Sequence, residues 1–207
     1  MSQKDLLIDM GFTDRKFPVS THMCLIYNSE DERKKVISKY LHSGVLHGEK
    51  VAYLADNATR SEVGKWLVEL GVDIQSPDVK KNLEILEAEN VYCSGGYFAP
   101  DKMLDALKVF QLAAEEKGYS CLRASGEMTW ALKGIPGSEK LIAYESRLND
   151  LVVTHPFVAL CQYDASKFDG KTIFNVLQVH PYMIVKGDIL SNPYYITPAD
   201  FLKTYNN

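Results

Sequence analysis

The segment HMCLIYNSEDE (residues 22–32) decides the fold. Its first six residues form a short apolar run, which predicts a buried β-strand that ends before Asn28 and Ser29. Directly behind it, between Asp31 and Leu46, apolar side chains recur at helical spacing with charged residues on the opposite face. A buried strand that leads into an amphipathic helix is the first half of a βαβ unit, so the pattern predicts a mostly parallel sheet.

The same alternation continues along the chain. Apolar runs predict further strands at residues 51–55, 83–86, 119–124, 157–163 and 182–185. Amphipathic segments between them predict helices that begin near Thr59 and Pro100 and that cover residues 141–151 and 173–177. No linker rich in Pro, Gly or Ser divides the chain. We therefore expect a three-layer, doubly wound α/β fold, with residues 1–20 as an N-terminal extension and residues 21–207 as a single domain.

Composition narrows the class of protein. The 207 residues carry 23 Lys+Arg against 27 Asp+Glu, a net charge of −4 that argues against direct nucleic-acid binding. The apolar runs are too short to span a membrane, and the first twelve residues lack the pattern of a signal peptide. The four cysteines contain no Cys-x-x-Cys pair, which favours reduced thiols. We expect a cytoplasmic protein that contacts neither membrane nor nucleic acid.

The turn after the first strand bears on nucleotide binding. A phosphate-binding loop needs closely spaced glycines and a lysine, because backbone amides and an ammonium group must surround the phosphates. This turn instead carries Glu30, Asp31 and Glu32, which would repel a triphosphate. Nucleotide hydrolysis and Rossmann-type dehydrogenase activity are disfavoured.

Two cysteines and two histidines are candidate ligands. His22 and Cys24 lie two residues apart on a strand, so their side chains share a face and could bind one metal ion. Further ligands would have to come from Cys161 and His180. The alternative interpretation is that the cysteines are small core residues and His22 is a hydrogen-bonded residue at a strand end.

A second candidate region follows the fourth predicted strand, where ligands bind in such sheets. Glu127 there could act as an acid or base beside an apolar wall containing Trp130, or it could cap the next segment while Trp130 packs in the core. For Tyr144 and Glu145, within a predicted helix, we expect a buried tyrosine and a solvated glutamate. Aromatic residues that could line a small pocket are Tyr92, Tyr97, Phe98, Trp130 and Tyr163.

Several short motifs together resemble one known family. They are His22–Tyr27, Tyr40-Leu41-x-x-Gly44-x-x-x-Gly48-Glu49, Gly118-Tyr119, Gly126-Glu127-Met128-Thr129-Trp130-Ala131, Tyr144-Glu145, Cys161-x-Tyr163 and His180-Pro181. Their order resembles the MEDS domain, the sensory domain of methanogens and methylotrophs that also occurs in regulators responding to dichloromethane. The resemblance runs from about Thr21 to Tyr195, nearly the whole chain.

The resemblance implies a fold similar to RecA and KaiC that lacks the phosphate-binding loop. In a RecA-like order the first and fifth strands are neighbours, which would place Cys24 beside Cys161. It also implies a non-catalytic sensor of small hydrocarbon derivatives that passes its signal to another protein, either as a monomer or as a homo-oligomer. No organic cofactor is expected. The alternatives are a degenerate nucleotide-binding protein and an enzyme that depends on a thiol or a metal.

The expected site combines both regions. Its ligand-binding residues are His22, Cys24, Glu127, Trp130, Cys161, Tyr163 and His180. If a metal is bound, its candidate ligands are His22, Cys24, Cys161 and His180, since thiol and imidazole groups suit soft and borderline metals.

Overall fold

The computed structural model describes residues 6–205, which form one seven-stranded sheet and a separate two-stranded sheet. The large sheet has the order β5-β4-β6-β7-β3-β8-β9, and its pairs are parallel except for the antiparallel pair β8–β9. Its strands are β3 (His22–Tyr27), β4 (Lys50–Ala55), β5 (Leu83–Glu87), β6 (Leu122–Glu127), β7 (Phe157–Asp164), β8 (Tyr182–Val185) and β9 (Asp188–Ser191). The expected α/β class with a mostly parallel sheet is confirmed.

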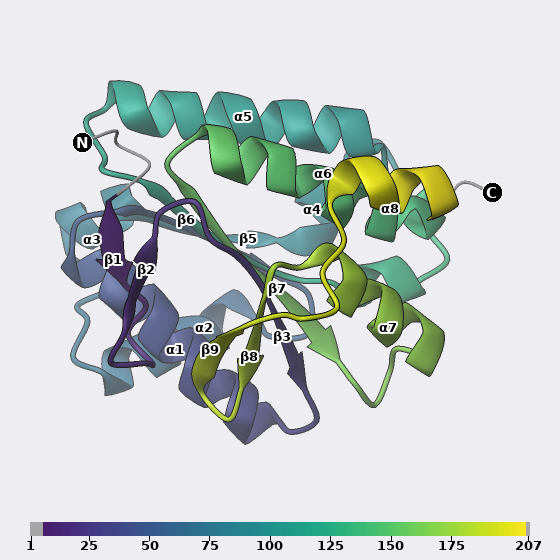
Figure 1. Ribbon diagram of the computed structural model, residues 1–207. Coiled ribbons are helices and arrows are strands. Elements are labelled where there is room, and N and C mark those ends of the chain that lie inside the picture. The colour runs from purple at the N-terminus through teal and green to yellow at the C-terminus, as the bar shows by residue number, and fades with distance from the viewer. Residues whose placement is uncertain (1–5, 206–207) are drawn as a thin grey trace.

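Helices cover both faces of this sheet (Figure 1). One face carries α1 (Glu30–Leu46) and α2 (Arg60–Glu69); the other carries α5 (Pro100–Glu116), α6 (Leu141–Thr154), α7 (Gly170–Val179) and α8 (Pro198–Tyr205). Shorter helices are α3 (Pro77–Asn82), α4 (Ala88–Tyr92) and the 3-10 turns Thr129–Leu132 and Ser138–Lys140. Within residues 6–205, no helix has the length and apolar character needed to cross a membrane.

The alternation of side chains along each strand divides the interior into two cores. On β3, Met23 and Leu25 point into the core beneath α1 and α2. Cys24, from the same strand, lies in the core beneath α5 to α8. The central strands β3, β4, β6 and β7 are buried on both faces, which is why apolar runs mark them in the sequence.

The centre of the sheet has the predicted neighbours. β3 pairs in parallel with β7, and Cys24 lies directly opposite Cys161 in the register. The prediction that the first and fifth strands of the parallel sheet are adjacent is therefore confirmed.

The strand β6 differs from its predicted range of 119–124, because it continues through Ser125 and Gly126 to Glu127. Small residues are required there. A Cβ atom on Gly126 would lie 2.4 Å from the Tyr92 hydroxyl, and the Ser125 hydroxyl donates to the carbonyl of Leu160 in β7. The pair Ser125-Gly126 therefore lies within the strand, although the predicted strand ended at residue 124.

The N-terminal segment adds a hairpin, β1 (Leu7–Asp9) and β2 (Lys16–Pro18), that sequence patterns did not predict. Its side chains Ile8, Met10, Phe17 and Val19 are buried in the core beneath α1. Residues 1–5 of the expected extension and the last two residues of the chain lie outside the described residues. The antiparallel strand β9 and the helix α8 were also not predicted.

Candidate functional site

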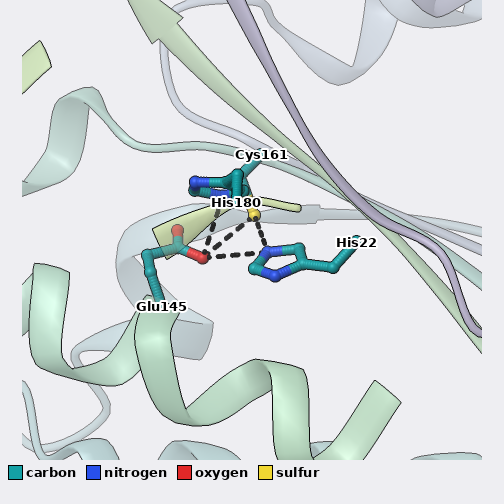
Figure 2. Close-up of side chains that lie close together, drawn as sticks. All are labelled: His22, Glu145, Cys161 and His180. Atoms are coloured by element: carbon teal, nitrogen blue, oxygen red, sulfur yellow. Dashed lines mark hydrogen bonds and ion pairs between the residues drawn. The ribbon is translucent and has the colours of Figure 1, made fainter. Parts of the chain in front are cut away.

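Four buried side chains from four different elements meet in the core beneath α6 and α7 (Figure 2). They are His22 at the start of β3, Glu145 in α6, Cys161 in β7 and His180 directly after α7. Their potential ligand atoms all lie within 4.8 Å of one another. Each side chain is at most 3% exposed, so solvent does not share in these contacts. We call these four residues the buried cluster.

Strand register explains why β3 and β7 contribute. His22 lies opposite Ala159, and Cys161 follows two residues later on β7, so His22 and Cys161 face the same side of the sheet. The helix α6 crosses that side and directs Glu145 toward them (Figure 2). His180 has an extended backbone and precedes Pro181, which disfavours a helical conformation at His180 and ends α7 there.

One oxygen of Glu145 is the centre of the buried cluster. Its Oε2 lies 3.3 Å from His22 Nε2, 3.5 Å from His180 Nε2 and 3.2 Å from Cys161 Sγ. Cys161 Sγ also lies 3.5 Å from His22 Nε2. The other oxygen, Oε1, accepts a 2.8 Å hydrogen bond from the Tyr163 hydroxyl. That bond orients the carboxylate and leaves Oε2 to the cluster.

Hydrogen bonds outside the cluster determine the tautomer of each histidine. The side-chain nitrogen of Asn149 donates to the carbonyls of Glu145, Ser146 and Val179, so Asn149 Oδ1 must be the atom that faces His22 Nδ1 at 3.0 Å. His22 Nδ1 is therefore the donor of that bond. His180 Nδ1 lies 2.7 Å from the carbonyl of Val176, which can only accept. Whenever either imidazole is neutral, its lone pair is thus on Nε2, the nitrogen that faces the cluster.

Burial and neighbouring charge determine the protonation states. Burial, together with the adjacent His180, lowers the pKa of His22 below its ordinary value and outweighs the opposing effect of Glu145. Burial by itself would raise the pKa of Glu145, but its contacts with His180 and His22 lower the pKa, so the carboxylate is ionised. Burial, and then the charge of Glu145, raises the pKa of Cys161 well above its ordinary value. Without a further cation the thiol stays protonated.

The structure reverses the roles expected for Cys24 and Glu145: Cys24 lies outside the buried cluster, and Glu145 belongs to it. Cys24 was a candidate metal ligand, but its thiol lies 3.8 Å from the carbonyl of Tyr182 and outside the group of four. Burial, followed by the charge of Glu145, raises the pKa of Cys24 to about 12. The expectation that Glu145 is solvated is wrong, because the side chain is fully buried. The sequence held a signal: Glu145 lies on the apolar face of its helix, between Leu141 and Leu148.

Glu127 and Trp130 occupy different cores and do not border a common pocket. The Glu127 carboxylate accepts hydrogen bonds from the Tyr53 hydroxyl at 2.6 Å and from the backbone amide of Asn57 at 2.5 Å. Arg33 Nη1 lies 2.9 Å from Glu127 Oε1, and both side chains are almost fully buried. These partners satisfy the carboxylate. Glu127 therefore ties α1 to the carboxyl end of the sheet, which corrects its expected place beside an apolar pocket.

The aromatic residues expected to line a pocket mostly pack against one another. Tyr92 stacks on Trp130 with ring centroids 4.8 Å apart, and Phe98 contacts Trp130 at the same distance. Trp130 is fully buried in this aromatic core, whereas Tyr97 is exposed. Tyr163 is separate and contacts Glu145. These contacts leave Tyr163 as the one aromatic residue of the expected set that touches the buried cluster.

A groove of about 300 Å³ at the surface reaches Cys24, and no residue of the buried cluster lines it. It lies at the carboxyl end of β3, beside β8 and α7. Residues along it include Cys24, Ile26, Asn28, Leu177, Met183 and Lys186. Because Cys24 also lies opposite Cys161 in the register, the inner end of the groove is adjacent to the cluster.

The fold and the site define the chain as a KaiC-like α/β domain without a phosphate-binding loop. A crystal structure of a KaiC-like protein from the hyperthermophilic archaeon Pyrococcus horikoshii OT3 superimposes with a TM-score of 0.62 over 86% of this chain and 79% of that chain. Sequence identity in that comparison is only 13%, so it shows the fold alone.

Residues 21–181 match the family of the MEthanogen/methylotroph, DcmR Sensory domain, and the chain belongs to this MEDS family. A curated relative, the transcriptional repressor DcmR of Methylorubrum extorquens, is 28% identical over 169 residues. The match covers 77% of this chain and 57% of the repressor, so the chain spans little more than half of that relative. Membership of the family and the match to a regulator support a sensory or regulatory role. The resemblance noted in the sequence is confirmed.

Proposed function

We propose that the chain is a non-catalytic sensory domain that binds a simple hydrocarbon derivative, such as a methylated or halogenated one-carbon compound, at the buried cluster. The observation that carries the proposal is the arrangement of His22, Glu145, Cys161 and His180 inside an otherwise apolar core. Burying polar groups is costly unless they are paired, and three of these four present acceptor atoms to one another. A core that retains such groups is well suited to recognise a small polar or polarisable ligand.

The groove beside β3 supplies the route and the size limit. Its volume of about 300 Å³ is at the small end of ligand pockets, and most of its lining is apolar. A one-carbon compound fits in a fraction of this volume, whereas a nucleoside triphosphate would fill or exceed it. Cys24 and Cys161 offer polarisable sulfur atoms on the path between the groove and the cluster.

Nucleotide binding, the alternative, finds no support at the position where KaiC-like proteins would hold phosphates. The turn after β3 ends in Ser29, whose hydroxyl accepts from the amide of Glu32 and so occupies the N-terminus of α1. Glu30, Asp31 and Glu32 occupy the first turn of that helix. Three carboxylates at this end would repel a phosphate chain.

The elements that carry the cluster residues indicate how a signal is transmitted. Its residues come from the strands β3 and β7, the helix α6 and the connection from α7 to β8. A ligand that changes their contacts shifts α6 and α7 relative to the sheet. The signal then passes from the outer surfaces of these helices to a partner protein, or to further segments of a longer chain.

The test is a thermal-shift and calorimetric titration with dichloromethane, methanol and methylamine, in parallel with ATP. A ligand selective for the folded state must raise the melting temperature, and we expect at least one of the three compounds to do so in a saturable way. The response should disappear in Cys24→Phe, which fills the inner end of the groove, and persist in Cys93→Ser, a thiol remote from it. Micromolar ATP binding with turnover, or no response to any of the three compounds, would overturn the proposal.

A further inference from the structure

We propose that His22, Glu145, Cys161 and His180 bind one zinc ion. The inference deepens the proposed function, since it assigns an inorganic component to the same buried cluster. It stands on four observations: the ligand geometry, the orientation of the lone pairs, the shortage of hydrogen-bond donors and the balance of charge.

The geometry matches a tetrahedral metal site. Zinc bonds of about 2.0–2.3 Å to nitrogen, oxygen and sulfur require neighbouring ligand atoms to lie roughly 3.3–3.6 Å apart. The four measured separations among the Glu145, His22, His180 and Cys161 atoms are 3.2, 3.3, 3.5 and 3.5 Å. The ligand atoms of the remaining pairs lie within 4.8 Å of each other. Small side-chain rotations would bring them into the range that zinc requires.

The lone pairs already point inward. Metal-binding histidines donate their second ring N–H to a carbonyl or a carboxamide oxygen, which orients the ring and makes the ligating nitrogen more basic. His22 has Asn149 in this role, and His180 has the carbonyl of Val176. Tyr163 holds Glu145 Oε1 in the same way. Three of the four ligands, His22, His180 and Glu145, are thus each oriented by a partner outside the cluster.

Hydrogen bonds alone leave the cluster unsatisfied. When both imidazoles are neutral, His22 Nε2, His180 Nε2 and Glu145 Oε2 are all acceptors, and the Cys161 thiol offers them a single hydrogen. Within the described chain, His180 Nε2 is fully buried and has no hydrogen-bond partner. An unpartnered buried acceptor is costly, and a cation at the centre would satisfy all four groups at once.

The balance of charge in the buried cluster also favours a zinc ion. The Glu145 carboxylate contacts two imidazoles and a thiol, none of which carries permanent positive charge. Zinc binding displaces the proton from Cys161, so that one carboxylate and one thiolate balance the charge of +2. The site becomes neutral, as its apolar surroundings require. Four protein ligands also make it a closed site, which would hold α6 and α7 against the sheet and leave the organic compound to bind beside the ion, at the inner end of the groove.

The first experiment measures metal content. The full chain is purified without chelators, its affinity tag is removed, and zinc is quantified by mass spectrometry of the intact protein and by elemental analysis. We expect one zinc per chain in the wild type and in Cys93→Ser, the matched control thiol. In Cys161→Ala we expect zinc affinity to fall by more than about 100-fold, because losing a ligand costs more than losing a residue that orients one, which typically costs about 10–100-fold.

The second experiment needs no variant. Replacing zinc by Co²⁺ in the wild type should produce a thiolate-to-cobalt charge-transfer band and the intense visible bands of tetrahedral cobalt. A wild type that binds no zinc and shows no such bands overturns the inference, as does stoichiometric zinc that persists in both Cys161→Ala and His180→Ala. If the purified wild type binds no zinc but dichloromethane still stabilises it, only the zinc inference is overturned. Zinc-bound protein that responds to none of the organic compounds overturns the sensor proposal alone.

Discussion

Two buried glutamates show how partners decide the role of a residue. Glu127 faces Arg33, the Tyr53 hydroxyl and a backbone amide, so its charge and its lone pairs are matched within the fold. Glu145 faces two imidazoles and a thiol, none of which carries a permanent positive charge. Burial is the same in both cases. Of the two glutamates, only Glu145 lacks a permanently cationic partner, which is why the functional proposals rest on it.

The pair of Arg33 and Glu127 gives a prediction about stability. Arg33→Met leaves the buried carboxylate without its cation, and Glu127→Gln leaves the buried guanidinium with only the exposed Glu30 as an anion. We expect each variant to lose about 3–5 kcal/mol in the free energy of unfolding, as is typical when one partner of a buried ion pair is removed. Urea denaturation measures this loss.

The double variant provides the control. Because both charges are then absent, Arg33→Met/Glu127→Gln should lose much less than the sum of the single losses. Strict additivity, or single losses below about 1 kcal/mol, would show that the two side chains do not form a coupled structural pair.

At the scale of elements, capping residues place the helices that carry the cluster. A capping box of Thr59 and Glu62 is present at the start of α2, on the other face of the sheet. The helix α7 has a related cap: Asp169 accepts a 2.6 Å hydrogen bond from the amide of Thr172. Since α7 ends at His180, the stability of its first turn bears on how firmly that imidazole is held.

The Asp169 cap predicts a pH dependence. The bond from the Thr172 amide, followed by that from its hydroxyl, lowers the pKa of Asp169 in the folded state. A depressed folded pKa contributes stability above the ordinary aspartate value of about 3.9, and this contribution is lost as the pH falls through the folded pKa. Asn caps helices about as well as Asp but does not titrate. The difference in unfolding free energy between the wild type and Asp169→Asn should therefore be constant above about pH 5 and change below about pH 4.

Guanidinium denaturation at a series of pH values measures that difference. Ser76→Ala, which removes the neutral cap of α3, is the control, and its difference in unfolding free energy should not change with pH. A difference that stays flat down to pH 3 would contradict the role given to the Asp169 carboxylate.

At the scale of the whole molecule, the N-terminal hairpin is joined to the main core. The carbonyl of Asp9 accepts hydrogen bonds from Arg123 Nη2 at 2.7 Å and from the Ser43 hydroxyl at 2.9 Å. Arg123 is fully buried and also pairs with Glu49, so the hairpin completes a buried polar network. Gly11 has a φ of +82°, and a Cβ there would lie 2.1 Å from the carbonyl oxygen of Lys39. The backbone passes too close to α1 for any larger residue.

These contacts predict that residues 1–20 are needed for stability. Removing them exposes the core that Ile8, Met10, Phe17 and Val19 cover, and burial of such side chains contributes about 1.5–3 kcal/mol each. We expect the shortened chain to lose roughly 5 kcal/mol or more of its unfolding free energy, measured by urea denaturation. Gly11→Ala, which strains the same contact without removing it, should show a smaller loss. A shortened chain as stable as the full one would make the segment a dispensable extension.

The sequence by itself determined the architecture. Continuous apolar runs such as His22–Tyr27, each followed by a helical period, can be buried only in a parallel sheet covered on both faces. That pattern is local and repeats along the chain, so the class of fold was predictable, whereas the adjacency of the strands that carry Cys24 and Cys161 followed from the RecA-like order that the family resemblance implied. Local patterning was less informative for the N-terminal hairpin, whose two short strands carry no clear period.

The tertiary structure decided which side chains form the site: it joins Glu145 to His22, Cys161 and His180, which residue type had already indicated, and leaves out Cys24. His22, Glu145, Cys161 and His180 are separated by up to 158 residues in the chain, and no spacing in the sequence relates them. Whether Glu145 is solvated or buried depends on how α6 rotates against the sheet, and that rotation is decided by packing on β3 and β7. The same packing excluded Cys24, which shares a strand face with His22 but points beside the cluster toward Tyr182. Residue types predicted the chemistry, and long-range packing chose which side chains come within contact distance.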